Sequence, residues 1–376
     1  MHAQDLQSPT GPIVENPCEN ARFATIALQG YFCRIRVKRV RYWIEWFLVR
    51  LFGLIIHSLP FGTVQRLADI GGALVFWLDF KGRRVALANL EVAFGSELNA
   101  RERRQIARRS LQVFGRNFLQ LFWTTRLTAR SAERYFFVED QEKFREFLEY
   151  DGPVIAITPH FGNVELVGAL LGLKGRSFSI IAQPLKNELL APLFTKLREA
   201  PGHKIIAPDN AAVRLLKALR AGESVFLLSD LTLKLRDAAV IIDAFGLKTR
   251  VTHIHAFLHL RTGAPILPWV TLPRPDGGCM IRLLPWLKFQ PGTSYQEITQ
   301  ACWNVFEPII RAYPQNWLWI YKHWRYRPSA AVRGYPFYAN RSTQFDLEVE
   351  SQENPEKAES LSALIKDHAR WQREKQ

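Results

Sequence analysis

The chain has little cysteine, no familiar nucleophile or nucleotide motif, and fewer acidic than basic residues. Its four cysteines, Cys18, Cys33, Cys279 and Cys302, form no CxxC pair and no short spacing. Neither a zinc site nor a disulfide framework is therefore indicated, and a reducing compartment is favoured. GxSxG, GxxxxGK[ST] and GxGxxG do not occur, which argues against serine hydrolases with a nucleophile elbow and against nucleotide-binding folds. The N-terminal stretch is polar and contains proline, unlike a secretory signal peptide.

The shortage of acidic residues leaves a formal net charge of +15, from 50 lysines and arginines against 35 aspartates and glutamates. Nucleic acid, or an anionic lipid surface with acidic partners, would each explain this charge. Basic residues 34–41 precede the apolar, tryptophan-containing stretch 42–60, and KGRR at 81–84 follows the apolar stretch 68–80. Basic clusters beside apolar segments are typical of cytoplasmic membrane anchors. We therefore expect a membrane partner and no nucleic acid.

Whether this N-terminal region spans a membrane is left open by the sequence. Glu45, Arg50 and His57 interrupt residues 42–60, and a spanning helix needs about 20 mostly apolar residues. An embedded or interfacial helix fits equally well. The plainer alternative is a pair of core helices in a soluble domain.

From residue 151 onward, short apolar runs alternate with amphipathic helical stretches. Strands are expected at 152–159, 177–184, 203–208, 223–230, 238–246, 264–273 and 279–287, and helices at 164–175, 187–200, 209–222, 252–263 and 294–312. This alternation predicts an α/β fold with a central, mainly parallel or mixed sheet flanked by helices, preceded by the hydrophobic helical anchor.

Four regions are expected along the chain. Residues 1–33 form a polar extension, 34–80 the basic and hydrophobic anchor, and 81–328 the α/β domain. Residues 329–376 form a charged tail with one weak helix near 361–372.

A histidine and a glutamate meet at the first strand-to-helix corner, in PHFGNVELVG (159–168). The strand should end at His160 and the helix should begin near Asn163, a favoured N-cap. Glu165 then lies in the first helical turn, where its carboxylate can accept a hydrogen bond from the histidine ring. Asp230 also follows an apolar strand, so it could share a crevice with His160. A structural histidine, and a capping or turn aspartate, are the plainer alternatives.

A histidine with an adjacent carboxylate and no side-chain nucleophile suits a general base. It would take a proton from a substrate hydroxyl, which then attacks an activated acyl group directly. Glu165 would fix the tautomer of His160 and stabilise its charged form. His253, His255 and His259 share a predicted helix without an acidic or cysteine cluster, so packing is favoured over metal binding. We expect no metal and no cofactor.

Several stretches resemble one family in order along the chain. HFGNVE (160–165) resembles the H-x4-D/E signature of membrane glycerolipid acyltransferases, in the HFGN-x-E form of the late acyltransferases of bacterial lipid A biosynthesis. The other matching stretches are RRVALANLEVAF (83–94), the strand ending at Asp230, Phe245 and Gly246 followed by Thr252, TGAPILP (262–268) and NWLWIYKHWRYRP (316–328). Together they cover roughly residues 80–328.

The resemblance implies acyl transfer from acyl carrier protein or acyl-CoA to a hydroxyl of a glycolipid, at the cytoplasmic face of a bacterial inner membrane. His160 would be the base and Glu165 its partner. The implied substrate-binding residues are Phe161, Gly162, Asn163, Gln183, Lys186, Asp230 and Arg325.

The chain also departs from the family pattern. Val164, Gln183 and Leu231 stand where relatives commonly carry tryptophan, arginine and glutamine. An arginine at position 183 could hold a phosphate of the acceptor, a task that Lys186 could take over only as a point charge. A lipid A precursor is the leading acceptor, with another glycolipid or an aminolipid as alternatives. A non-catalytic lipid carrier and a lipid hydrolase are competing functions.

Overall fold

The computed structural model describes residues 17–182, 185–274, 276–331 and 334–354, with side chains from Lys38 onward. The helices are α1 (Pro17–Ser58), α2 (Phe61–Leu78), α3 (Phe80–Phe94), α4 (Ala100–Trp123), α5 (Ala129–Ala132), α6 (Gln141–Glu149), α7 (Val164–Leu173), α8 (Ala191–Glu199), α9 (Ala211–Arg220), α10 (Ile254–Thr262), α11 (Tyr295–Ala312) and α12 (Thr343–Glu353). Short 3-10 turns lie at Gly95–Glu97, Thr124–Arg126 and Pro314–Asn316. The predicted weak helix near 361–372 lies outside the described residues.

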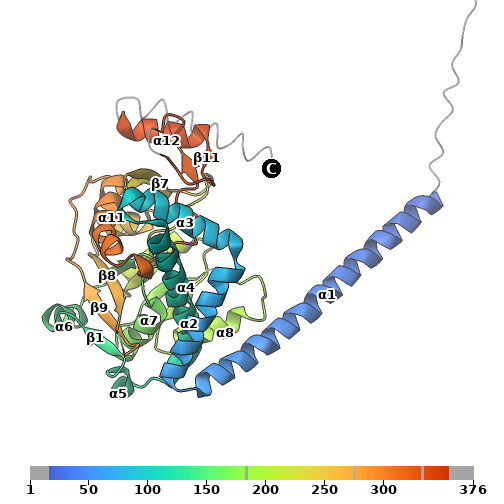
Figure 1. Cartoon of the computed structure of the whole chain (residues 1–376), viewed down its shortest axis with the longest axis horizontal. Helices are drawn as coiled ribbons and strands as arrows, with labels where there is room; N and C mark the ends of the chain where they lie inside the picture. Colours follow the sequence, from blue (N-terminus) through green and yellow to red (C-terminus); the bar gives the residue numbers. More distant parts are fainter. Residues whose placement is uncertain (1–16, 183–184, 275, 332–333, 355–376) are drawn as a thin grey trace, which may run out of the picture.

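A seven-stranded sheet forms the centre of the fold, in the order β1-β9-β8-β2-β5-β3-β4. Its strands are β1 (Phe136–Val138), β2 (Ile155–Thr158), β3 (Ser179–Ile181), β4 (Lys204–Ile206), β5 (Val225–Leu228), β8 (Ile266–Pro273) and β9 (Cys279–Leu283). All neighbours are parallel except β8 and β9. The helices lie around this sheet (Figure 1), so the predicted α/β fold with a mainly parallel sheet is confirmed.

One predicted strand belongs elsewhere. The run 238–246 contains β6 (Val240–Ala244), which pairs antiparallel with β7 (Leu247–Val251) in a separate two-stranded sheet. The two-residue turn between them has Phe245 at φ 53° and Gly246 at φ 74°, as hairpin turns that match strand twist require. The prediction that 238–246 adds to the central sheet was therefore wrong, because the turn folds this run back on the next one.

The second apolar stretch of the expected anchor is partly packed within the fold. In α2, Val64, Ala68 and Gly72 are buried. A Cβ at Gly72 would lie 2.5 Å from the backbone of Gln112, and one at Gly115 would lie 2.8 Å from the carbonyl of Ala68. Glycine at both positions is therefore what lets α2 and α4 approach so closely.

The other faces of the N-terminal helices are exposed. The exposed large apolar residues of α1 and α2 include Trp43, Phe47, Leu54, Ile70, Leu74, Trp77 and Leu78, each at least half exposed. Within the described part of the chain, no helix combines the length and apolarity needed to cross a membrane. The first part of α1 extends away from the rest of the chain (Figure 1).

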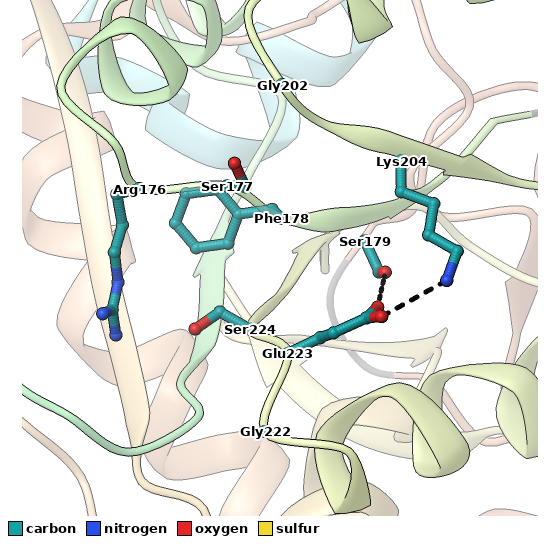
Figure 2. A pocket seen from close by; sticks show the side chains of 9 residues that line it. All are labelled: Arg176, Ser177, Phe178, Ser179, Gly202, Lys204, Gly222, Glu223 and Ser224. Atoms are coloured by element: carbon teal, nitrogen blue, oxygen red, sulfur yellow. Dashed lines mark hydrogen bonds and ion pairs between the residues drawn. The ribbon is translucent and has the colours of Figure 1, made fainter.

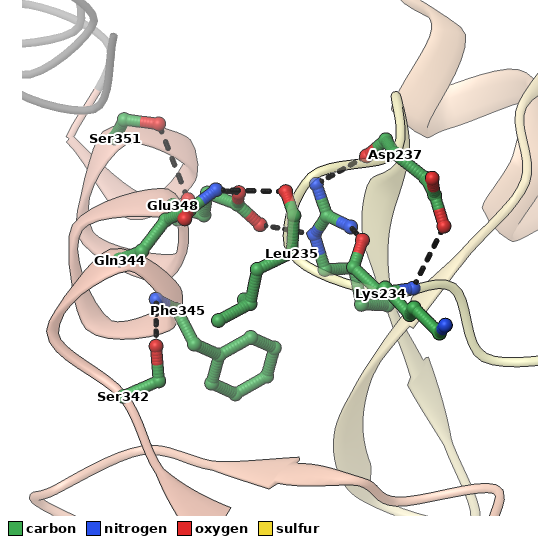
Figure 3. Close-up of polar contacts among 9 residues, drawn as sticks. Lys234, Leu235, Asp237, Ser342, Gln344, Phe345, Glu348 and Ser351 are labelled. Atoms are coloured by element: carbon green, nitrogen blue, oxygen red, sulfur yellow. Dashed lines mark hydrogen bonds and ion pairs between the residues drawn. The ribbon is translucent and has the colours of Figure 1, made fainter. Parts of the chain in front are cut away.

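Helix α12 packs against the β6–β7 hairpin. Arg250 of β7 is almost completely buried; its Nε donates to Glu348 of α12 at 2.7 Å and its Nη2 donates to the Asp237 carbonyl at 2.7 Å. Gln344 donates to the carbonyl of Leu235 at 3.0 Å (Figure 3). The short strands β10 (Tyr326–Arg327) and β11 (Asn340–Arg341) connect this helix to the body. The boundary drawn at residue 328 stays a prediction.

Candidate active site

The turn after β2 is built around a glycine that no other residue could replace without strain. Gly162 has φ 65°, and a Cβ there would lie 2.1 Å from both the carbonyl and the hydroxyl oxygen of Thr271. Its N–H donates to the Asn316 carbonyl at 2.8 Å, and its carbonyl accepts from Asn117 Nδ2 at 2.6 Å. The turn is therefore held between β8, α4 and the segment around Asn316.

Asn163 caps α7 as predicted. Its side-chain oxygen accepts from the N–H of Leu166 at 3.0 Å, and its own N–H donates to Thr271 Oγ1 at 2.6 Å. Its amide group donates to Gln120. The polar groups of Asn163 are therefore all hydrogen-bonded at the turn that follows His160.

The carboxylate bonded to His160 is that of Asp230. Its Oδ1 lies 2.7 Å from His160 Nδ1, and the Asp230 side chain is fully buried while that of His160 is 18% exposed. Strand register explains the pairing. Thr158 of β2 is opposite Leu228 of β5, and His160 and Asp230 each follow two residues later at the carboxyl edge of the parallel pair.

The electrostatics keep Asp230 ionised. Burial by itself would raise the pKa of Asp230, but the charge and hydrogen bond of His160, with a smaller contribution from His323, lower it to about 2. A carboxylate only accepts hydrogen bonds, so Nδ1 of His160 carries the proton. In the neutral ring, Nε2 then keeps a lone pair that can accept a proton.

Glu165 has a different partner, which corrects the expected pairing with His160. Arg198 of α8 donates two hydrogen bonds to Oε1 of Glu165, from Nη2 at 2.5 Å and from Nε at 3.1 Å. Burial by itself would lower the pKa of Arg198, yet the hydrogen bond and charge of Glu165 raise it. No hydrogen bond joins Glu165 to His160 among the described residues. The first turn of α7 directs the Glu165 carboxylate toward α8. The carboxylate bonded to His160 is that of Asp230, which follows β5, the strand next to β2.

The remaining sequence candidates fall into distinct places. Phe161 is fully buried and forms a β-bridge with Trp317, so it belongs to the wall of the site. Lys186 is exposed on the loop between β3 and α8, which leaves the same edge of the sheet. Arg325 lies over the ring of Tyr321 at 5.1 Å. Gln183 lies outside the described residues.

Two aromatic residues at the site were not singled out from the sequence. Trp317 Nε1 donates to Asp230 Oδ2 at 2.7 Å, and the ring of His323 stacks on Trp317 with centroids 4.0 Å apart. Burial lowers the pKa of His323 to about 4, against a smaller opposing effect of Asp230. Both residues lie in the stretch 316–328, which sequence resemblance marked only as a block. Their roles depend on a contact with Asp230 that spacing cannot reveal.

The three histidines near α10 are engaged in packing. His259 Nδ1 lies 2.8 Å from the Ala264 carbonyl, and its Nε2 accepts from the N–H of Phe289 at 3.0 Å. His255 is fully buried, which lowers its pKa to about 3. His253 stacks on Tyr295 with centroids 5.0 Å apart.

A hollow of about 410 Å³ lies at the amino-terminal edge of the same sheet (Figure 2). Its charged groups bond to each other or to the backbone. Glu223 accepts from Ser179 at 2.8 Å and from Lys204 at 3.3 Å, while Arg176 donates to the carbonyls of Tyr150 and Gly152. Its residues lie at the opposite end of β3 and β5 from Asp230.

The histidine–carboxylate pair lies at the carboxyl edge of parallel strands, where ligands of open α/β folds bind. Residues 33–326 match the model of the bacterial lipid A biosynthesis acyltransferases. The chain therefore belongs to this family and is an acyltransferase, as the sequence resemblance predicted.

Individual relatives agree with this assignment. The chain is 25% identical over 304 residues to the lipid A biosynthesis lauroyltransferase of Escherichia coli, an alignment that covers 78% of this chain and 95% of the relative. It is 30% identical over 178 residues to the phosphatidylinositol mannoside acyltransferase of Mycolicibacterium smegmatis, covering 46% of this chain and 57% of that protein. The enzyme of the same name from Mycobacterium tuberculosis is also 30% identical, over 181 residues and 54% of its length.

Proposed function

We propose that this enzyme transfers a fatty acyl chain from acyl carrier protein to a hydroxyl of a lipid A precursor, with His160 as the general base. The observation that carries the proposal is the 2.7 Å hydrogen bond between His160 Nδ1 and the buried carboxylate of Asp230. Asp230, rather than Glu165, is the partner of the base. Glu165 and Arg198 support the first turn of α7 and hold it against α8.

The reaction needs one proton carrier. His160 Nε2 takes the proton of the acceptor hydroxyl while its oxygen attacks the thioester carbonyl, forming a tetrahedral intermediate. The carbon–sulfur bond then breaks, and the imidazolium returns the proton to the leaving thiolate. Asp230 stabilises the imidazolium and keeps the proton of the resting ring on Nδ1, as the carboxylate does in a Ser-His-Asp triad. No enzyme-bound acyl group is formed.

The proposal includes a membrane and an acidic donor protein. The exposed apolar residues of α1 and α2 are flanked by the basic stretches 34–41 and 81–84, a combination that favours an anionic lipid surface. We place the enzyme at the cytoplasmic face of the bacterial inner membrane. The net charge of +15 fits an acidic carrier protein as donor.

The test uses membranes that carry the full chain, as wild type, His160→Ala and Glu165→Gln. Each is incubated with a radiolabelled acyl chain carried either by acyl carrier protein or by coenzyme A. The acceptor is either a lipid A precursor or a phosphatidylinositol mannoside. We expect labelled lipid A precursor with the wild type, and a loss of about 10² to 10⁴ in rate in His160→Ala. Faster transfer from acyl-CoA would contradict the proposed donor.

The other outcomes are equally decisive. Label on the mannoside alone would refute the proposed acceptor while keeping the reaction. Undiminished transfer by His160→Ala would refute the proposed base. Release of free fatty acid without labelled lipid would point to a hydrolase.

A further inference from the structure

The Asp230 carboxylate is held from two sides by different segments. Its Oδ1 accepts from His160 Nδ1 and its Oδ2 accepts from Trp317 Nε1, each at 2.7 Å. The torsion that turns a carboxylate about its last carbon–carbon bond has broad minima, so one donor alone leaves the plane of the group poorly fixed. A second donor on the opposite oxygen defines the plane and hence the direction in which Oδ1 meets the imidazole.

Trp317 is itself fixed on several sides. Its side chain is 1% exposed, its ring stacks on His323, and Trp319 meets it edge-on with centroids 4.7 Å apart. Phe245 stacks on it with centroids 5.7 Å apart. A packed ring of this kind has one accessible rotamer, so its N–H points in one direction.

The backbone of the same residue is joined to the turn that carries the base. Trp317 forms a β-bridge with Phe161, and its carbonyl accepts from Ser110 Oγ at 2.6 Å. The preceding Asn316 accepts from the N–H of Gly162. One residue therefore contacts Asp230 through its indole and, through its backbone, Phe161, which directly follows His160.

We infer that Trp317 is a positioning residue for acyl transfer, whose indole N–H orients the Asp230 carboxylate so that it presents Oδ1 to His160. This inference rests on the proposed role of His160 as the base. His323 contributes by packing: its Nε2 donates to the Leu318 carbonyl at 2.8 Å. Burial lowers the pKa of His323 to about 4, so its ring is neutral near pH 7 and adds no positive charge beside the imidazolium formed at His160.

Three substitutions separate the N–H from the packing. Trp317→Phe keeps an aromatic ring and removes the donor. Trp317→His keeps a ring nitrogen at the position of the indole nitrogen and removes the second ring. Trp123→Phe is the matched control, because Trp123 is also buried, its Nε1 donates to the Leu59 carbonyl at 3.0 Å, and its ring packs on Phe61 and Tyr135 rather than on Trp317.

The first measurement is steady-state transfer. We expect Trp317→Phe to lower kcat about 10- to 100-fold with little change in KM, as for loss of a hydrogen bond to a charged group. Trp123→Phe should stay within about threefold of wild type, since it loses a bond to a neutral carbonyl and does not pack on Trp317. Trp317→His should recover most of the lost kcat, although it packs less well. Equal losses in Trp317→Phe and Trp123→Phe, or no recovery in Trp317→His, would overturn the inference.

The second measurement does not depend on activity. A proton shared between an imidazole nitrogen and a carboxylate gives a strongly downfield NMR signal, which can be assigned by its absence in His160→Ala. We expect this signal to move or broaden in Trp317→Phe and to persist in Trp123→Phe. An unchanged signal in Trp317→Phe refutes the positioning role. A wild-type protein that shows the signal but transfers no acyl group would refute the proposed function instead.

Discussion

A carboxylate is bonded to a basic side chain at both the amino edge and the carboxyl edge of the central sheet, but the two pairs differ in burial. At the amino edge, Glu223 is bonded to Lys204 and Ser179 near the surface. At the carboxyl edge, the fully buried Asp230 is bonded to Nδ1 of His160, and Nε2 of that ring makes no hydrogen bond to the described residues. Water screens the first set of charges, and burial strengthens the second. The comparison shows that the two edges differ in burial: the charges at the amino edge lie near the surface, and the carboxylate at the carboxyl edge is fully buried.

The largest expected effect comes from removing the charge at the carboxyl edge. Asp230→Asn preserves the shape of the side chain but lets the amide donate, so His160 would be held in the wrong tautomer. We expect kcat to fall about 10²- to 10⁴-fold, as much as in His160→Ala at most, because Asp230 acts through the base. Transfer assays measure this, with a folded circular dichroism spectrum as control. A loss of less than tenfold would show that Asp230 does not act with the base.

The buried carboxylate of Asp230 should also make the free energy of unfolding depend on pH in the acidic range. The pKa of Asp230 lies at about 2 in the folded chain and near 3.9 in an unfolded one. Its contribution, about 2 kcal/mol, is therefore complete above pH ~4 and is lost as the pH falls to about 2. Urea unfolding of wild type and Asp230→Asn between pH 2 and 6 tests this. The difference between the two proteins should shrink on acidification, and a constant difference would contradict the assignment.

An intermediate effect is expected at the corner between α7 and α8. Glu165→Gln leaves Arg198 partly buried without its charged partner, which should cost about 1 to 3 kcal/mol of unfolding free energy. Because Glu165 does not contact His160, kcat should fall less than about tenfold. Denaturant unfolding and transfer assays on the same preparation separate the two effects. A loss of activity as large as that of His160→Ala would restore Glu165 as the partner of the base.

The smallest effect is expected at the amino edge. Glu223→Gln removes a surface ion pair with Lys204, and such pairs contribute about 0 to 1 kcal/mol. We expect the midpoint of urea unfolding to change little and kcat to stay within about twofold of wild type. A large loss of transfer activity would mean that the hollow beside Glu223 takes part in the reaction.

Local patterns were sufficient for the elements and for part of the site. The apolar run before His160 and the asparagine at position 163 predicted a strand, a turn and a capped helix, and the structure has β2 and α7 with Asn163 as N-cap. The hairpin of β6 and β7 was missed because its turn requires Phe245 in a left-handed conformation, which aromatic residues rarely adopt. Packing of that ring among tryptophans, not local preference, holds it there.

By itself, the sequence determined the alternation of strands and helices, the family and the place of His160 at the end of the first buried strand. Those features depend on periodicity, capping and short motifs, which are local. Only the tertiary structure decided which carboxylate His160 meets and which residue holds that carboxylate. Asp230 is 70 residues from His160, and Trp317 is 87 residues from Asp230. Strand register and aromatic packing bring them within 2.7 Å, and neither can be read from the spacing of residues along one chain.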